Sequence, residues 1–517
     1  IDINGTAAEV AAAVDDVNTF SGTPTATLSN AHTLAELKAI NNKLTGQITL
    51  NDYTVALSGS SSDVAAALDG TFAAAYTGTA TLSDPHTLAE LKTVNNGTTG
   101  QITLNDYTVA LSGSTADVKA ALDGSFAAAY TGNVTISDAN TVDITATDIT
   151  QIEGDTTGTI TVTNNIDING TAAEIAAAVA DVNTFSGTPT ATLSNAHNLA
   201  QLKAINNKLS GTLTLNDYTV ALSGSTADVK AALDGSFAAA YTGNVTISDA
   251  NTVDITATDI TQIEGDTTGT ITVTNSIDIN GTAAEVAAAV DDVNTFSGTP
   301  TATLSNAHTL AELKAINNKL SGTLTLNDYT VALSGSAADI AAALAGTFAA
   351  QYTGNVTISD ADVGDINATD INTIASATSG TITISNNVDI NGTATAVSTA
   401  VGNVNTFSKA AVTATLSTNH SLAELKAINN AVGGQLTLNS YAVALSGSTA
   451  DVKDALDGSF AATYTGNVTL SDANTEDITA TDITQIEGDT DGTITVTNNI
   501  DINGTAAEVA AAVDDVN

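Results

Sequence analysis

The sequence is marked first by residue types that are absent or scarce. Its 517 residues include no Cys, no Met, no Trp, no Arg and only four Pro. Without Cys, disulfide bonds cannot hold the fold, and the redox compartment cannot be inferred from them. The 12 basic residues stand against 56 acidic ones, so the formal net charge is −44. This charge argues strongly against nucleic-acid binding, which needs a basic surface, and it disfavours an anionic membrane surface.

Catalytic and membrane signatures are also missing. No apolar run approaches the length of a transmembrane helix. No GxSxG, HExxH or P-loop motif occurs. Carboxylates are so numerous that two close together are weak evidence for a glycosidase-like pair. We therefore predict that this sequence is not an enzyme. Its 43% hydrophobic content and regular period predict a continuous core, in contrast to a disordered acidic tail.

A long repeat organises the whole sequence. The phrase IDINGTAAE recurs, with one variant, VDINGTATA. One period holds four smaller coils, A, B, C and D, which contain 29, 24, 32 and 26 residues in the unit that starts at Gly158. The first repeat reads A-B-C-B-C-D, which indicates an internal duplication. We expect one continuous solenoid and no separate globular domains. The long repeats are residues 1–165, 166–276, 277–387 and 388–499, and a further A coil starts at 500–517.

Each coil combines two hydrophobic periods. Segments such as GTITVTN alternate Thr with apolar residues, which is strand spacing, and a second short strand often follows. Capping-box patterns such as Thr6 to Glu9 then start short, Ala-rich helices. The sequence predicts an α/β tandem-repeat solenoid of strand–(strand)–helix coils of about 24–32 residues. A continuous sheet would form one side and the helices the other.

More detailed expectations follow from the same pattern. Val10, Val14, Leu34 and Leu37 should be buried, and polar residues such as Lys38 and Lys92 should face solvent. The dipeptides NN and ND between the two strands of a coil allow a tight hairpin. Coils A, C and D would then be ββα and coil B βα. The sequence leaves the curvature of the solenoid open.

Histidine and the aromatic residues recur with the scaffold. Each histidine stands at the start of a B helix, and all ten Tyr lie in C coils, two per coil. A catalytic His needs unlike partners nearby, whereas these recur with the repeat. We interpret His and the aromatics as structural residues that fill an Ala-rich core. The histidines are His32, His86, His197, His308 and His420.

A ladder of Asx residues is the main candidate binding feature. Asn and Asp recur at the turn after the first strand of C and D coils, where stacked oxygen atoms would suit Ca²⁺. The alternative is that Asn and Asp simply favour turns. The fifth C coil has Asn439 and Ser440, which weakens the metal hypothesis there. The candidate Ca²⁺ ligands are Asn51, Asp52, Asn105, Asp106, Asp138, Asn216, Asp217, Asp249, Asn327, Asp328, Asp360, Asp362 and Asp472.

A second ladder consists of threonine. Thr159, Thr161 and Thr163 alternate along one strand, and Thr212 and Thr214 along another. A flat TxT array is typical of ice-binding solenoids, but Thr is also a common residue on exposed strands. The B strand between them carries Pro189 and Ala191, and coil lengths vary, so the array is irregular. Ice binding is therefore a third possibility.

Repeat style suggests a family. TVALSGSTADVKAAL and DITATDITQIEGDTTGTITVT resemble the tandem repeats of giant secreted or cell-surface proteins of bacteria, especially marine cyanobacteria. The resemblance spans the whole sequence and rests on style and composition. It implies an extracellular or cell-surface structural segment, as in a fibre, a surface layer or a rigid stalk. The alternative is a Ca²⁺-stiffened adhesin stalk that presents a binding domain outside this sequence.

The first and last eighteen residues are identical, IDINGTAAEVAAAVDDVN. This identity suggests a window cut from a longer repeating polypeptide. We expect the final helix, 505–516, to present the same apolar face as the helix at 6–17. The expected partner is therefore the chain itself, joined head to tail, either covalently or between subunits.

Overall fold

The computed structural model describes residues 1–140 and 142–516. The final residue of the repeated eighteen, Asn517, lies outside the described residues. Contacts divide the chain into two units. Unit 1 comprises Ile1–Ile247 and Ile263–Thr270, and unit 2 comprises Ser248–Gln262 and Ile271–Asn517. Both units are built from the same four kinds of coil, so each is described by itself.

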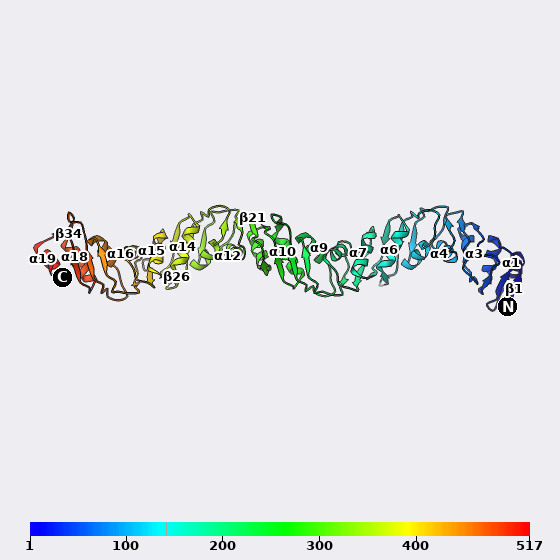
Figure 1. The fold of residues 1–517 in the computed structure, drawn as a ribbon, viewed down its shortest axis with the longest axis horizontal. Coiled ribbons are helices and arrows are strands. Elements are labelled where there is room, and N and C mark those ends of the chain that lie inside the picture. The colour runs from blue at the N-terminus through cyan, green and yellow to red at the C-terminus, as the bar shows by residue number, and fades with distance from the viewer. Residues whose placement is uncertain (141, 517) are drawn as a thin grey trace. The chain divides into compact units, whose positions relative to one another are not determined.

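Nineteen helices occur in the described residues, one for each coil that the repeat pattern predicts. Within unit 1 the labelled helices follow one another in chain order (Figure 1). The A helices are α1 (Ala7–Asp15), α7 (Ala172–Asp181), α11 (Ala283–Asp292), α15 (Ala394–Asn403) and α19 (Ala506–Asp515). The B helices are α2 (Leu34–Asn41), α4 (Leu88–Gly97), α8 (Leu199–Asn206), α12 (Leu310–Lys319) and α16 (Leu422–Ala431). The C helices are α3 (Ser61–Leu68), α5 (Thr115–Leu122), α9 (Thr226–Leu233), α13 (Ala337–Leu344) and α17 (Thr449–Leu456), and the D helices are α6 (Ala146–Asp155), α10 (Ala257–Asp266), α14 (Ala368–Ala377) and α18 (Ala480–Asp489).

The helices start and pack largely as the sequence predicts. The Thr6 hydroxyl caps the backbone N–H of Glu9, and the Glu9 carboxylate accepts from the Thr6 N–H, which completes a capping box. Val10, Val14 and Leu37 are buried, as expected. Leu34 is only half-buried, because it stands in the first turn of its helix, at the edge of the core.

The strands are short, and those that the structure pairs are parallel. In A coils the strands before the helix are β10 (Ile160–Val162), β18 (Ile271–Val273), β27 (Ile382–Ile384), β35 (Ile494–Val496), β1 (Asp2–Gly5), β11 (Asp167–Gly170), β19 (Asp278–Gly281), β28 (Asp389–Gly392) and β36 (Asp501–Asn503). The B strands are β2 (Thr25–Leu28), β5 (Ala80–Leu82), β13 (Thr190–Leu193), β21 (Thr301–Leu304) and β30 (Thr413–Leu416). In C coils they are β3 (Ile48–Thr49), β6 (Ile102–Thr103), β14 (Leu213–Thr214), β22 (Thr323–Thr325), β31 (Leu436–Thr437), β4 (Leu57–Gly59), β7 (Leu111–Gly113), β15 (Leu222–Gly224), β23 (Leu333–Gly335) and β32 (Leu445–Gly447). In D coils they are β8 (Val134–Ile136), β16 (Val245–Ile247), β25 (Val356–Ile358), β33 (Val468–Leu470), β9 (Asp143–Thr145), β17 (Asp254–Thr256), β26 (Asp365–Asn367) and β34 (Asp477–Thr479), and two-residue strands follow some helices at β12 (Thr184–Phe185), β20 (Thr295–Phe296), β24 (Thr347–Phe348) and β29 (Thr406–Phe407).

The α/β tandem-repeat solenoid is therefore confirmed, but its sheet side differs from the expected single sheet. In unit 1 the strands form short parallel sheets, for example β14-β13-β11-β9 and β12-β10-β8-β7. The two strands of one coil, such as β10 and β11, belong to different sheets, so the NN and ND turns do not make hairpins in the paired strands. The B coil explains the interruption: its one strand, β13, pairs with the second strand of coil A and the first strand of coil C.

Glycine opens the coils because their turns lie very close together. A Cβ atom on Gly158 would lie 2.2 Å from the carbonyl oxygen of Gly132, the glycine that opens the preceding coil. A Cβ on Gly132 would in turn lie 2.0 Å from the Val109 carbonyl oxygen. Only glycine allows this approach of backbone to backbone. The recurring Gly-Thr and Gly-Asn dipeptides thus mark the points where the backbone of one coil contacts that of the previous coil.

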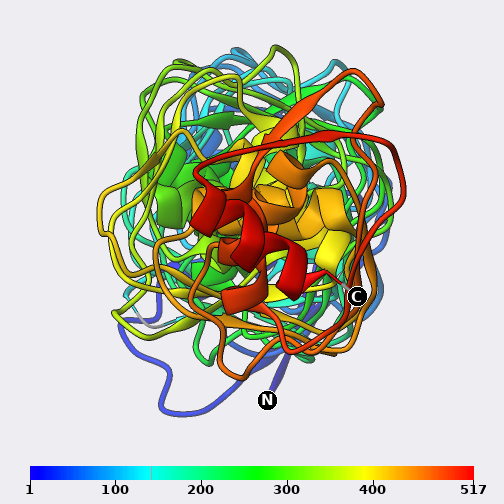
Figure 2. The same ribbon diagram turned by 90° about the vertical axis from the view of Figure 1, so that its left-hand side faces the viewer.

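The core lies between the helices and the strands of each coil. In unit 2, as in unit 1, the inward Ile, Leu and Val side chains of strands and helices are buried coil after coil. Figure 2, seen from the C-terminal end, shows the last helices of unit 2, in red and orange, one behind the other. No coil encloses these side chains alone, so burial depends on the neighbouring coils.

Candidate functional site: the polar joints between coils

Contacts between successive coils are called joints here, and at several of them a side chain of the later coil caps a helix of the earlier one: B coils cap A helices, and D coils cap C helices. The carboxylate of Asp138, at the end of a D strand, accepts from the backbone N–H of Thr115 at 2.8 Å and from its hydroxyl at 2.6 Å. Asp360 accepts from the backbone N–H of Ala337, and Asp472 accepts from the backbone N–H and the hydroxyl of Thr449. These carboxylates satisfy N–H groups that the first turn of a helix leaves without partners. Three of the candidate Ca²⁺ ligands therefore serve as caps between coils.

The remaining Asx candidates lie at separate turns. In C coils the carboxylate accepts from the Thr two residues later. Asp52 accepts from the Thr54 hydroxyl at 2.7 Å and from its backbone N–H at 2.8 Å, and these two bonds lower the pKa of Asp52. Asp106, Asp217 and Asp328 repeat the contact. The preceding residues, Asn51, Asn105, Asn216 and Asn327, are exposed, and the amide of Asn105 donates to the Ser83 carbonyl. Asp362 accepts from the Asn387 N–H, and the carbonyl of Asp249 accepts from the Asn275 amide.

The structure does not bring these candidates together into one cluster. In the part of the chain that it describes, no group of three or more His, Cys, Asp or Glu side chains is placed to hold a metal ion. Ca²⁺ prefers six to eight oxygen ligands, so bound ion would need water or backbone oxygens beside these carboxylates. Calcium binding stays a prediction.

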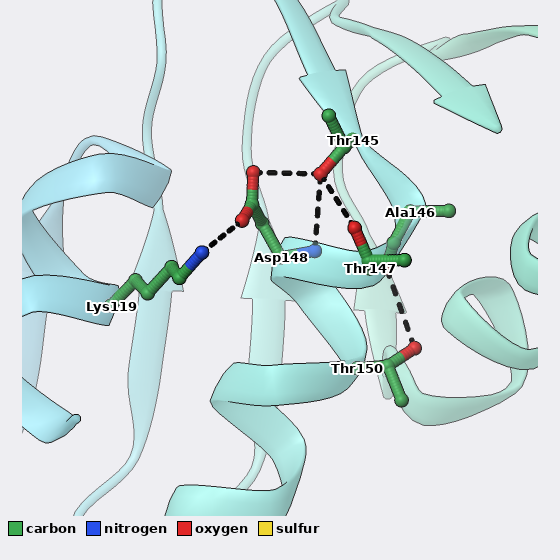
Figure 3. A network of polar contacts seen from close by, with 6 residues as sticks. All are labelled: Lys119, Thr145, Ala146, Thr147, Asp148 and Thr150. Carbon is green, nitrogen blue, oxygen red and sulfur yellow. Dashed lines mark hydrogen bonds and ion pairs between the residues drawn. The ribbon is translucent and has the colours of Figure 1, made fainter.

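Lysine links successive helices through ion pairs. Lys119 of α5 donates to Asp148 of α6 at 2.6 Å, and the second oxygen of Asp148 accepts from the Thr145 hydroxyl at 2.7 Å (Figure 3). Burial alone would raise the pKa of Asp148, but these hydrogen bonds and the Lys119 charge outweigh it and lower the pKa. Asp148 thus belongs to the cap of its own helix and to the contact with the coil before.

The same contact joins B helices to C helices. Lys38 and Lys92 pair with Asp63 and Asp117, and their side chains are partly buried, which differs from the expectation that they face solvent. The prediction missed the carboxylate that the next coil places beside each lysine. Lys203, Lys314 and Lys426 repeat the pair with Asp228, Asp339 and Asp451.

Histidine forms a buried polar contact wherever a B coil meets the following C coil, at what we call a B–C joint. His32 is 3% exposed, and its Nε2 lies 2.9 Å from the Tyr76 hydroxyl, which donates to the Val55 carbonyl oxygen at 2.7 Å. Burial lowers the pKa of His32 and raises that of Tyr76. His86, His197, His308 and His420 make the same contact with Tyr130, Tyr241, Tyr352 and Tyr464.

The two strands of the Thr ladder, β10 and β14, belong to different sheets, and the B strand beside β14 carries threonines that bind aspartate. Thr190 and Thr192 of β13 donate to the two carboxylate oxygens of Asp167 on the neighbouring β11, at 2.8 and 2.9 Å. Asp167 also lies in register with Asp143 of β9 on its other side. In this sheet of unit 1, two aspartates therefore stand in register on β9 and β11, followed by threonine on β13.

A second pair of carboxylates lies at the joint between α5 and α6. One oxygen of Asp155 is buried without a hydrogen-bond partner among the described residues. Burial and the nearby Asp123 raise the pKa of Asp155. A hollow of about 440 Å³ lies beside it, lined in part by Phe126 and Tyr130. Asp234 and Asp266 repeat this pair in unit 1, and Asp457 and Asp489 in unit 2.

Comparisons with known proteins give little similarity. No family model matches the sequence, and no curated protein matches it. Among solved structures, the chain is similar to the LRR ectodomain of the plant membrane receptor kinase GASSHO1/SCHENGEN3 from Arabidopsis thaliana, in complex with CASPARIAN STRIP INTEGRITY FACTOR 2. Identity is 11%, and the match covers 95% of this chain and 65% of that chain, just under two thirds of it. Because the TM-score is 0.15, this similarity carries no argument about function.

Helix length also bears on membrane insertion. Within residues 1–140 and 142–516, none of the helices has both the length and the apolar composition needed to cross a bilayer.

Proposed function

We propose that this chain is a structural segment of a very long extracellular repeat protein, in which it forms part of a fibre, a surface-layer element or a rigid stalk. One observation carries the proposal: the polar side chains of the joints bind the adjacent coil. Asp138 caps a helix of the previous coil, Lys119 pairs with the following one, and His32 reaches a tyrosine of the next. Contacts of this kind transmit load from coil to coil.

Composition supports the same function. With a net charge of −44, lateral association between chains is disfavoured unless cations screen the surface. The resemblance to giant secreted repeat proteins supports an extracellular or cell-surface location. The partner in this proposal is the chain itself, continued head to tail, and the proposal includes no catalytic activity.

Pulling the full chain from its two ends tests the proposal. A load-bearing stack should resist force and then open in steps of one or a few coils, because neighbouring coils stabilise one another. One coil of 24–32 residues releases on the order of 100 Å of extended chain. Steps of this size at measurable force are expected. Extension without measurable resistance would overturn the structural role.

A Ca²⁺-stiffened adhesin stalk is the second candidate. Its support is the register of Asp143 with Asp167 and of Asp365 with Asp389, because adjacent strands lie only about 4.8 Å apart. Like charges at that spacing repel, and a divalent cation between them would offset the repulsion. The presented binding domain would lie outside this sequence.

Melting in two salts separates the two candidates. If Ca²⁺ binds the folded chain, it should raise the melting temperature more than Na⁺ at the same ionic strength. The variant Asp143→Asn with Asp365→Asn should reduce that difference, and Asp16→Asn, an exposed helix-end residue, serves as the matched control. If both salts raise the melting temperature of the unaltered protein equally, ionic screening alone explains the effect, and the calcium-binding candidate is contradicted.

A further inference from the structure

The five His–Tyr contacts fix a specific protonation state. A carbonyl oxygen can only accept, so the Tyr76 hydroxyl must give its proton to the Val55 carbonyl. The hydroxyl oxygen then accepts from His32, which places the imidazole proton on Nε2. The other ring nitrogen, Nδ1, is an acceptor, and it is buried without a partner among the described residues. Nδ1 of the other four histidines is in the same situation.

We propose that these contacts make the B–C joints of the solenoid acid-sensitive, so that protonation of the buried histidines loosens one coil from the next. A second proton must go to Nδ1, where it finds no acceptor and adds a charge to a buried site. His32 belongs to coil B, and Tyr76 and Val55 belong to the next coil, so the strain falls on the interface. The inference concerns regulation of the fold and does not depend on the proposed mechanical role.

The surrounding charges differ between joints. The neighbouring carboxylates favour the protonated ring, whereas burial opposes it more strongly and lowers the pKa in each case. The fifth joint has Ser440 where other C coils have Asp, so His420 is left with one carboxylate. The titratable groups facing each ring are Asp52, Glu36 and Tyr76 for His32; Glu90, Asp106 and Tyr130 for His86; Asp217 and Tyr241 for His197; Asp328, Glu312 and Tyr352 for His308; and Glu424 and Tyr464 for His420.

The direction of the effect follows from linkage. Because the folded pKa of His32 lies below its ordinary value of 6.5, the unfolded joint binds protons more strongly. The joint is therefore fully stable above pH 6.5 and loses stability as the pH falls from 6.5 towards the folded pKa. Over that window the opening equilibrium of one joint rises by up to about tenfold per pH unit.

Hydrogen–deuterium exchange of the full chain at pH 7.5, 6 and 5, corrected for the intrinsic exchange rate, tests the proposal. Peptides from the B helices should lose protection as the pH falls. Peptides from the A helices, whose coils contain no His, provide the control within the same sample. A variant with all five histidines changed to Gln keeps an amide donor and cannot titrate here, so its B helices should keep their protection at pH 5. Equal losses in A and B helices, or equal losses in the Gln variant, would overturn the proposal.

Nitrogen NMR of the unaltered protein keeps the test decisive if the Gln variant does not fold. With labelled histidine, the rings should show the Nε2–H tautomer and titrate below pH 6.5 while the chain stays folded. Rings that carry the proton on Nδ1, or that titrate like free histidine, would contradict the proposal.

Discussion

Two C–D joints of the same chain share a backbone and differ in charge. In unit 1 the C strand pairs with the D strand at Leu111 and Val134, and in unit 2 the equivalent pair is Leu333 with Val356. The bridge between Tyr and the Thr that ends the D helix is also present in both. The charged side chains that the second joint lacks include Lys119, Asp123 and Asp155, which are replaced there by Ala341, Ala345 and Ala377.

The difference shows which contacts define a joint. The second joint has no Lys–Asp pair from its C helix, because Ala341 stands in the place of the lysine. There Gln351 donates its side-chain amide to the Ala377 carbonyl oxygen at 2.9 Å. The strand register survives this exchange unchanged. The core and the backbone ladder therefore determine how coils stack, and the charges adjust the stability of the stack.

The largest effect should come from the core that both joints share. Ile152 and Ile374 are 0% exposed on α6 and α14. Replacing either with Ala should cost about 2–5 kcal/mol of local stability, through lost burial and a cavity. Hydrogen exchange of peptides from the altered helix measures the loss. The two costs should be alike, and a clear inequality would show that the joints also differ in packing.

A smaller but equal effect should come from the shared threonine. Thr156 donates to the Gly132 carbonyl oxygen and accepts from the Gly158 N–H, and Thr378 does the same with Gly354 and Gly380. Replacement of either Thr by Val leaves two backbone groups without partners and should cost about 1–3 kcal/mol. Replacement by Ser keeps the hydroxyl and is the matched control. If Val and Ser behave alike, the hydroxyl does not stabilise the joint.

The smallest effect should be a pH dependence of stability that the first joint shows and the second does not. Since the folded pKa of Asp155 is raised, its charge destabilises the joint at neutral pH, and protonation relieves this as the pH falls through the folded pKa. Asp155→Ala should therefore slow exchange in α6 at pH 7, by less than about 1 kcal/mol because water screens the carboxylates. The gain should disappear on acidification. In the second joint, the double change of Ala345 and Ala377 to Asp should create the same dependence, and a flat pH response there would contradict it.

Much of the fold could be predicted from the sequence because the patterns that start its helices and strands are local. Capping boxes such as Thr33 to Glu36 lie within one turn and fix where a helix begins. The break between sheets was not readable, because strand β13 finds its partners in two other coils. Nothing inside one coil records which strand of the next it will meet.

The joints were only partly predictable for a related reason. The structural role of histidine followed from its recurrence, but its tyrosine partner did not, although the two are 44 residues apart in all five cases. The constant spacing is the signal that identifies such a pair. The two aspartates of the first joint are replaced together, by Ala345 and Ala377, in the second. This coupled replacement is a second signal of the same kind.

The short sequence separation of the paired strands has a consequence for the order in which the coils fold. In the parallel pairs of unit 1, a residue meets its partner about one coil along the chain, as Asp2 meets Thr25 and Ile160 meets Val134. Contacts of low sequence separation form quickly and need no distant partner. Each coil can therefore add to the folded stack as soon as it has been synthesised or delivered through a narrow channel. The first coils can thus fold before the last residues of the chain have been synthesised.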